Sequence, residues 1–423
     1  MMKKLFLLSV AFLMGAMTFT SCSSNDDDNK SGDTSKYSNK MYGQDAISKC
    51  ELLITQLKAA NTAIGTAQLT SDQDKFLRNI LTGVVNNVII PTYTDLANDV
   101  EDLEKTLNGL TTSTITQAQI DKACTDFKKA RQHWERSEAF LMGAASDFSI
   151  DPTIDSWPLD RKELLDYFKG GMKAEIEDES SILGFHALEF ILFRNGQNRK
   201  VAELQGNDTY KNFEGVSGAD ELKYAQQVCK LLKERCFQLQ VAWEGKTSAN
   251  TNRVSVVEKA GLDYVTEKGL SYGDNLINAG VSGKNSTFPN IQAAISQVLS
   301  NNEGSCLAIA NEVGSAKILN PFQNGDIAYV ESPYSYNSIT DFQDNIRSIR
   351  NVWYGSTDGN AASISFNNFF SSVNPTLNTA VVNAFTNAIN AIGNMPAPFV
   401  KYCSVIWNKD FDDPTNWDST SGE

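Results

Sequence analysis

The stretch TQAQIDKACTDFKKARQHWERSEAFLMG, residues 116–143, repeats apolar side chains at helical spacing. Most successive apolar positions are three or four residues apart, which places them on one face of a helix. The segment therefore predicts a long amphipathic helix whose apolar face packs against other helices. The positions on that face are Ile120, Ala123, Phe127, Ala130, Trp134 and Leu141.

Two segments before this stretch show the same spacing. Residues 46–61, AISKCELLITQLKAAN, carry one apolar stripe. Residues 71–107 open with a capping pattern of Ser71 and Asp74 and predict a second long helix, with a kink at Pro91.

A fourth helix is predicted after the Gly170–Gly171 break, over residues 172–193, MKAEIEDESSILGFHALEFILF. Strand signals are scarce throughout the chain. Four long helices are enough for one bundle, so the first half of the chain predicts a helical bundle.

A polar, glycine-bearing link over residues 195–220 precedes a second helical series. The segments DFKKARQHWERSEAFLMG and DFQDNIRSIRNVWYG, one from each half, share a faint pattern that suggests an internal duplication. The prediction is an all-α protein of two bundles with about four helices each. The helices of the second series are expected at 219–245, 287–317, 338–355 and 374–393, and the predicted parts are a first bundle at 41–214, a second at 215–410 and a tail at 411–423.

The first residues have the pattern of a secretory signal, with Lys3 and Lys4 before a short apolar run. That run is too short for a lasting membrane span. It leads into FTSC, which resembles the lipobox of bacterial lipoproteins, although Phe19 stands where leucine is usual. We therefore expect residues 1–21 to be removed and Cys22 to carry a lipid anchor.

Residues 22–40 are polar and acidic, without an aliphatic side chain, and predict a flexible tether. The run from Asp26 to Asp28 resembles the export signal that sends lipoproteins of Bacteroidetes to the cell surface. We expect a lipid-anchored protein of the cell envelope, displayed on the outer-membrane surface. A tether that faces the periplasm and is merely soluble is the alternative.

The formal net charge of the chain is −14, and loss of Lys3 and Lys4 with the signal changes it to −16. A negative field of this size disfavours nucleic acid and favours cationic partners. The six remaining cysteines show no CxxC pair and no dense spacing, so buried thiols are expected rather than disulfides. They are Cys50, Cys124, Cys229, Cys236, Cys306 and Cys403.

The stretch ILGFHALEFILF, residues 182–193, contains two polar side chains, His186 and Glu189. On a helix they lie about 60° apart and can face one point. They could pair with each other, serve as satisfied core residues or supply two ligands to a metal. His133 is the only other histidine and HExxH does not occur, so neither a multi-histidine site nor the usual zinc-protease motif is supported.

Candidate partners for this pair lie upstream. Trp134 and Glu138 are four residues apart and therefore share one face of the predicted helix, and the apolar AFLMG that follows suggests that Glu138 points inward. The loop SIDPTIDSWPLD, residues 149–160, is rigid and carries Asp155. Each residue taken alone also has a structural explanation, as a helix-surface charge or a turn residue.

GFHALE at 184–189 resembles the GxHxxE signature of the imelysin family. WERSEAFLMG, IDPTIDSWPLD and ESPYSYNSITDFQDNIRSIRNVWYG agree in order, and the resemblance covers about residues 41–410. It implies two duplicated bundles with a site near their junction. Carried over by position, the resemblance implies ligand-binding roles for Trp134, Glu138, Asp155, Trp157, Pro158, Gly184, Ser335, Asp341 and Arg347, beside His186 and Glu189 of the signature.

The family contains peptidases and iron-regulated envelope proteins, so two functions stay open. The first is a non-enzymatic protein of iron uptake, which binds a metal, a metal chelate or an envelope partner. Its metal ligands would be His186, Glu189 and Glu138, suited to iron or another divalent ion more than to zinc.

The second function is a metal-dependent endopeptidase that uses the same three residues. The sequence favours the first, because a glutamate that ligates the metal cannot also be a free base. A structural lipoprotein, in which His186 and Glu189 only stabilise the bundle, is a third possibility.

Overall fold

The computed structural model describes residues 34–173, 176 and 181–419, and within them the chain is almost entirely helical. The sheet found in these ranges is one antiparallel pair, β1 (Phe193–Arg194) with β2 (Gln197–Asn198). The predicted all-α class is therefore confirmed. None of the helices in these ranges combines the length and the apolar character that a bilayer crossing requires.

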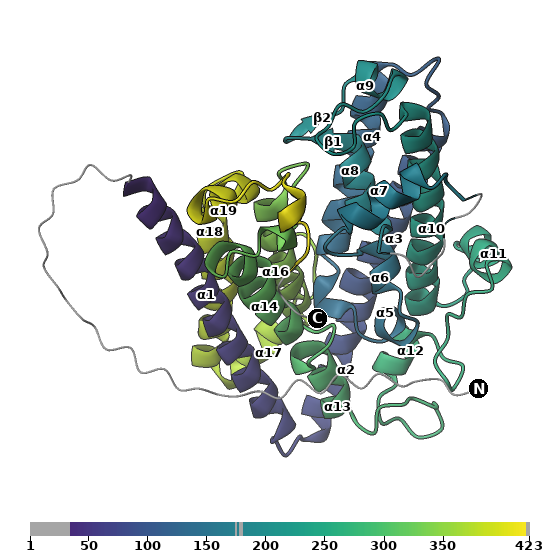
Figure 1. The fold of residues 1–423 in the computed structure, drawn as a ribbon. Coiled ribbons are helices and arrows are strands. Elements are labelled where there is room, and N and C mark those ends of the chain that lie inside the picture. The colour runs from purple at the N-terminus through teal and green to yellow at the C-terminus, as the bar shows by residue number, and fades with distance from the viewer. Residues whose placement is uncertain (1–33, 174–175, 177–180, 420–423) are drawn as a thin grey trace, which may run out of the picture. The chain divides into compact units, whose positions relative to one another are not determined.

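The first of two groups of helices surrounds the aromatic side chains of residues 116–143. Phe127 and Trp134 are buried there, as the apolar stripe predicted. Every residue of the GxHxxE helix is buried as well, so that helix lies in the middle of the group. The group consists of α3 (Ile90–Asn108), α4 (Gln117–Glu135), α8 (Gly184–Leu192) and α10 (Gly218–Glu244), and Figure 1 shows their arrangement.

The second group is built on the pairing of two long helices from the end of the chain, α16 and α18. It also receives the first described helix, α1 (Thr34–Gly65), since the Nδ2 atom of Asn61 donates to the Oγ atom of Ser296 at 3.3 Å. Its other members are α13 (Ile291–Ser300), α14 (Cys306–Glu312), α16 (Ser338–Tyr354), α17 (Phe366–Val373) and α18 (Pro375–Gly393).

The two groups meet where α16 packs against α4, and both belong to one compact unit, Ser35–Glu423. The groups do not follow chain order. α10 comes after residue 214 but packs with α3 and α8, whereas α1 comes before it and contacts α13. The boundary between residues 214 and 215, and the duplication, stay predictions.

The long helix expected over residues 71–107 has an irregular centre. α2 (Ser71–Val84) passes through a π-helical turn, η1 (Val85–Ile89), into α3, and Pro91 lies in the first turn of α3. The predicted cap is wrong by one position. Thr70 accepts from the backbone of Gln73 at 3.2 Å, and the Gln73 side chain accepts from the backbone of Thr70 at 3.0 Å.

Two predicted helices are shorter than expected. The helix of residues 116–143 ends at Glu135, because the Ser137 hydroxyl donates to the Trp134 carbonyl at 2.7 Å and the chain turns into the 3₁₀ turn η2 (Glu138–Phe140). The helix of residues 172–193 begins only at Gly184, after an extended Leu183.

The helix expected over residues 287–317 is interrupted between α13 and α14 and continues into a second π-helical turn, η3 (Val313–Ile318). The remaining elements are short connections between the helices of the two groups. They are α5 (Ala144–Asp147), α6 (Asp151–Ile154), α7 (Arg161–Lys169), α9 (Val201–Gln205), α11 (Thr251–Lys259), α12 (Tyr272–Ile277), α15 (Leu319–Gln323), η4 (Ile327–Tyr329), α19 (Phe399–Trp407) and η5 (Pro414–Asn416).

The predicted signal at 1–21, the lipidation site Cys22 and the run Asp26 to Asp28 lie outside the described residues. α1 begins at Thr34, inside the segment predicted as a tether, where no proline or glycine interrupts the chain before Gly43. The six cysteines after Cys22 are all buried free thiols, which confirms the prediction.

Candidate functional site

The GxHxxE helix begins directly against the end of α6. Gly184 has a φ of +71°, and a Cβ atom there would lie 2.0 Å from the carbonyl oxygen of Ile154. Only glycine lets the two backbones approach this closely. The contact places His186 beside Asp155, the residue that follows α6.

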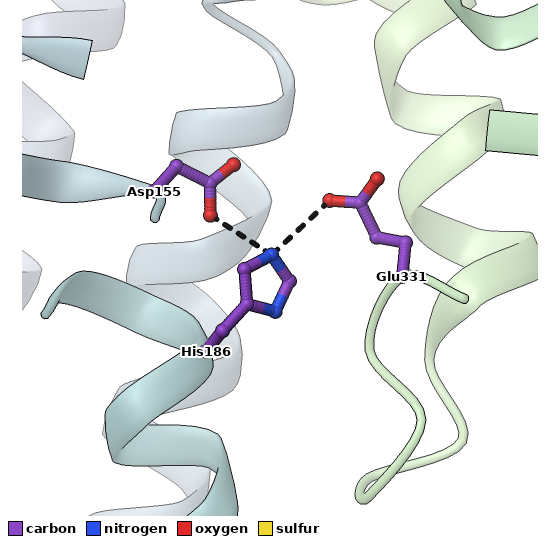
Figure 2. A group of neighbouring side chains, drawn as sticks. All are labelled: Asp155, His186 and Glu331. Carbon is purple, nitrogen blue, oxygen red and sulfur yellow. Dashed lines mark ion pairs between the residues drawn. The ribbon is translucent and has the colours of Figure 1, made fainter. Parts of the chain in front are cut away.

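His186 is buried and faces carboxylates with both ring nitrogens. Its Nε2 atom lies 3.1 Å from Asp155 Oδ1 and 3.6 Å from Glu331 Oε1, the two contacts drawn in Figure 2. Its Nδ1 atom lies 3.6 Å from Glu189 Oε2. The histidine therefore bridges a loop of the first half, its own helix and the segment before α16.

The pKa values show that these are charged contacts. Burial alone would lower the pKa of His186, but the carboxylate of Asp155 outweighs burial and raises that pKa well above its ordinary value. Burial alone would raise the pKa of Glu331, but Lys317, His186 and Arg131 lower it to about 2. An imidazolium between ionised carboxylates is therefore the favoured state.

Glu189 connects the GxHxxE helix to the segment that precedes α16. Its Oε1 atom accepts hydrogen bonds from the Tyr334 backbone at 3.1 Å, the Ser335 backbone at 2.7 Å and the Ser335 hydroxyl at 2.6 Å. Three donors satisfy that oxygen. Glu189 thus holds two distant parts of the chain together.

Arg131 of α4 is the centre of the cluster. Its guanidinium pairs with Asp155 and Glu331, lies 2.5 Å from Glu135, and has its Nε atom 3.9 Å from Asp341. Asp155 also accepts from the Trp134 indole. Arg131 therefore links the first helix group to Glu331 and Asp341 of the second.

Lys317 is the second buried cation, with only 2 % of its surface exposed. Its Nζ atom lies 2.6 Å from Glu331, 3.4 Å from Glu312 and 4.9 Å from the centre of the Trp157 ring. Lys317 belongs to the π-helical turn η3, and such turns are frequent at functional sites.

The cluster contains more carboxyl groups than cations, and this changes their protonation. Burial, followed by repulsion from neighbouring carboxylates, raises the pKa of Asp151 to about 7. Burial raises the pKa of Asp341 to about 7 and the pKa of both Glu135 and Glu138 well above the ordinary value. Such groups release their protons when a further cation arrives.

A cavity of about 520 Å³ opens beside this cluster. Glu138, Asp151, Glu303 and Glu312 contribute to its wall, whereas no basic side chain of the described residues does. Glu138 is only 5 % exposed and has no hydrogen bond or close ion pair among the described residues, although the charge of Lys317 lowers its pKa. An acidic cavity with an unpaired buried carboxyl group suits a cation.

Two groups of side chains could hold a metal ion within the described ranges. The ligand atoms within each group lie no more than 4.8 Å apart. In the first group, Arg131 already pairs with both carboxylates. The second group shares Glu138 with the cavity wall, although Arg131 also pairs with its other two members, Glu135 and Asp155. The groups are Asp155, His186 and Glu331, and Glu135, Glu138 and Asp155.

The ligand trio expected from the resemblance is neither of these groups. Glu189 turns one oxygen to the backbone of residues 334–335, and α4 ends before Glu138, so Trp134 and Glu138 do not share a helical face. His186 faces Asp155 through its Nε2 atom instead.

Most other residues implied by the resemblance lie at the cluster, but Arg347 does not. Arg347 pairs with Asp344 at 2.8 Å and with Gln343 at 3.3 Å. It stands six positions after Asp341 on α16 and therefore faces another side of that helix. Pro158 follows Trp157 in the loop. The residues found at the cluster are Trp134, Glu138, Asp155, Trp157, Gly184, His186, Glu189, Ser335 and Asp341.

The sequence did not predict the two buried cations, Arg131 and Lys317, or two of their partners, Glu135 and Glu331. One signal was available: Arg131 follows Phe127 by four residues and precedes Glu135 by four, so both charges lie on the buried face of α4. For Lys317 there was none, because the π-helical turn shifts the helical phase.

Residues 89–413 match the family model for imelysin. The chain belongs to the imelysin family. It is 24% identical over 317 residues to iron-regulated protein A of Synechococcus elongatus, a match that covers 75% of each chain. A crystal structure described as an iron-regulated protein A precursor from Parabacteroides distasonis is similar to this fold. It has a TM-score of 0.65 and 26% identity, over 83% of this chain and 94% of that one.

Proposed function

We propose that this imelysin-family protein is a non-enzymatic binding protein of iron uptake, which captures a metal ion or a cationic metal chelate in the acidic cavity. The observation that carries the proposal is Glu138, a buried carboxyl group in the cavity wall without a hydrogen bond or ion pair in the described chain. Burial raises the pKa of that carboxyl group well above its ordinary value although the charge of Lys317 lowers it, so the group keeps its proton until a further cation binds.

The positions of the acidic side chains indicate where a cation would enter and which oxygen atoms would bind it. Asp151 and Glu312 line the cavity, and the carboxyl oxygens of Glu138, Glu135 and Asp155 lie close enough together to share one ion. These ligands are oxygen atoms, which suit hard cations better than a thiolate or multi-histidine site would. Iron is therefore a more suitable ligand than zinc.

The iron part of the proposal rests on similarity. The relative from Synechococcus elongatus and the structure from Parabacteroides distasonis both carry the name iron-regulated protein A. That name describes regulation of those proteins and identifies no ligand.

The location in the cell is proposed from the sequence. The pattern of residues 1–21 and Cys22 supports export and a lipid anchor in the membrane, and the run Asp26 to Asp28 supports display at the outer-membrane surface. An envelope protein of iron uptake would be its partner there.

Metal-dependent peptide hydrolysis is the alternative, supported by the group of Asp155, His186 and Glu331. It would require Arg131 to leave both carboxylates and His186 to lose a proton. Hydrolysis of insulin or casein that stops on addition of a chelator and in Glu189→Gln would establish it.

Calorimetric titration with Fe²⁺ under nitrogen, and with Zn²⁺ and haem for comparison, tests the binding proposal. The variant Glu138→Gln keeps the shape of the side chain and is expected to weaken Fe²⁺ binding by about tenfold or more. Glu214→Gln removes the same charge from an exposed position and is expected to bind as the unchanged protein does. The proposal is wrong if no iron species binds, or if Glu138→Gln binds Fe²⁺ as tightly as Glu214→Gln.

A further inference from the structure

A second cavity, of about 500 Å³, shares no wall residue with the acidic cavity. It lies where the α5 segment, the end of α10 and α12 come together. The Tyr272 hydroxyl of α12 donates to Asp147 Oδ2 of α5 at 2.7 Å, and Phe148 touches the Tyr272 ring edge to face. The wall therefore comes from separate parts of the chain, within residues 142–147, 243, 266–276 and 287–297.

Aromatic side chains form much of this wall: Trp243, Tyr272 and Phe288. The rings of Trp243 and Tyr272 lie with their centres 6.2 Å apart. Gly143 holds Tyr272 in place, since a Cβ atom there would lie 2.6 Å from the tyrosine ring. The aromatic wall is thus fixed before any ligand arrives.

One polar atom in this wall has no partner. The side chain of Trp243 is only 2 % exposed, and its buried Nε1 atom forms no hydrogen bond with the described residues. A buried N–H group without an acceptor is costly. The amide of Asn275, which also lines the cavity, donates to the Thr287 hydroxyl and accepts from the Thr287 backbone. The tryptophan thus contributes its ring to the wall, while its N–H group is covered by protein.

The charged side chains of the wall are both acidic, Asp147 and Glu267, and no basic side chain of the described part of the chain contributes to it. Asp147 uses one oxygen for Tyr272, and both carboxyl side chains are exposed to solvent. Aromatic rings beside carboxylates attract organic cations, because the ring faces and the carboxylates are both negative. The net charge of the chain, −14, acts in the same direction.

We propose that this cavity binds a small organic ammonium ion. The ammonium group lies beside the rings of Trp243 and Tyr272, near Asp147. The site is separate from the one formed by Glu138 and does not depend on it.

Titration calorimetry of the full chain with choline tests this proposal, because choline is a small quaternary ammonium ion. Its uncharged isostere, 3,3-dimethylbutan-1-ol, has the same shape and is expected to bind about tenfold more weakly or not at all. Asp147→Asn is expected to weaken choline binding about three- to tenfold. Asp147 is exposed, so this change leaves the core intact, and an unchanged melting curve checks that.

Two controls make the outcome specific. Glu214→Gln removes an exposed negative charge elsewhere, and Glu138→Gln alters the other cavity; both are expected to bind choline as the unchanged protein does. The proposal is overturned if the uncharged isostere binds as tightly as choline, or if Asp147→Asn has no effect. Absence of choline binding up to ~10 mM, or tighter binding of N-acetylglucosamine than of choline, would also overturn it.

Discussion

Replacing Arg131 by methionine should destabilise the protein strongly without opening a large hole, because methionine fills much of the same volume. Arg131 is 1 % exposed and pairs with Asp155 and Glu331, two carboxylates whose pKa values lie below the ordinary range. Burial opposes both of these pKa shifts, and cations including Arg131 outweigh it. Without the arginine, the two carboxylates keep one close cation each, His186 and Lys317.

Two estimates bound the loss in the free energy of unfolding that Arg131→Met should cause. Removing one partner of a buried ion pair costs about 3–5 kcal/mol. The carboxylate left without its partner can instead take up a proton, which at pH 7 costs about 4 kcal/mol for a group with an ordinary pKa near 4. The expected loss in the free energy of unfolding of Arg131→Met is therefore about 3–4 kcal/mol at pH 7.

This argument also fixes the pH dependence. The variant would hold a proton in the native state that its unfolded chain releases above pH 4, so its stability rises as the pH falls towards 4. The difference between Arg131→Met and the unchanged protein should thus shrink by about 1.4 kcal/mol per pH unit between pH 7 and pH 5.

Urea unfolding followed by circular dichroism at pH 7 and pH 5 measures both effects. Arg347→Met is the matched control: Arg347 is 24% exposed on its side chain, and its partner Asp344 keeps Arg136 at 3.0 Å. That variant should lose no more than about 1 kcal/mol. If the two variants lose similar stability, or if the loss in Arg131→Met is the same at both pH values, Arg131 does not hold the cluster together electrostatically.

Two further predictions concern the backbone and the acids. Gly184→Ala should lower the free energy of unfolding by about 3 kcal/mol or more and weaken the His186–Asp155 contact, because the strain of a positive φ adds to the clash with Ile154. Gly171→Ala, where no atom lies within 4 Å, should lower it by about 1–2 kcal/mol. Unfolding curves of the two variants compare these losses. Burial raises the pKa of Asp151 to about 7, so the native carboxyl group holds a proton that the unfolded chain releases above pH 4, and stability falls as the pH rises from about 4 to 7. Asp151→Asn should therefore be more stable than the unchanged protein by about 1–2 kcal/mol at pH 8 and equal to it at pH 4, and equal stability at both pH values would contradict the raised pKa.

Helical periodicity predicted the fold class and several long helices well, because the apolar spacing of segments such as 116–143 and 338–355 is set by burial of one face. It failed at helix ends. α4 ends at Glu135 through a hydrogen bond from Ser137, and α8 begins at a glycine with positive φ pressed on Ile154. The first is a local hydrogen bond and the second is a tertiary contact between separate segments, and the spacing of apolar residues reports neither of them.

Part of the candidate site was predicted, namely the residues that stand out against their neighbours in the sequence. His186 and Glu189 stood out because they interrupt an apolar helix, and Asp155 because its loop is unusual. Lys317 gave no signal, since its burial depends on a π-helical turn and on Glu331 far along the chain. Charges that neutralise one another across a junction are visible only after the chain has folded.

The structure also separates two roles that the GxHxxE signature combines. His186 and Glu189 have partners within the chain: Asp155 and Glu331 for the histidine, and the backbone of residues 334–335 for the Oε1 atom of the glutamate, whose Oε2 atom forms no hydrogen bond with the described residues. Glu138 has no such partner and faces the cavity. If the proposal is correct, changes in the signature pair should act mainly on stability, and changes at Glu138 mainly on binding. Loss of function in a signature variant would then identify a ligand-binding role only if its unfolding free energy is unchanged.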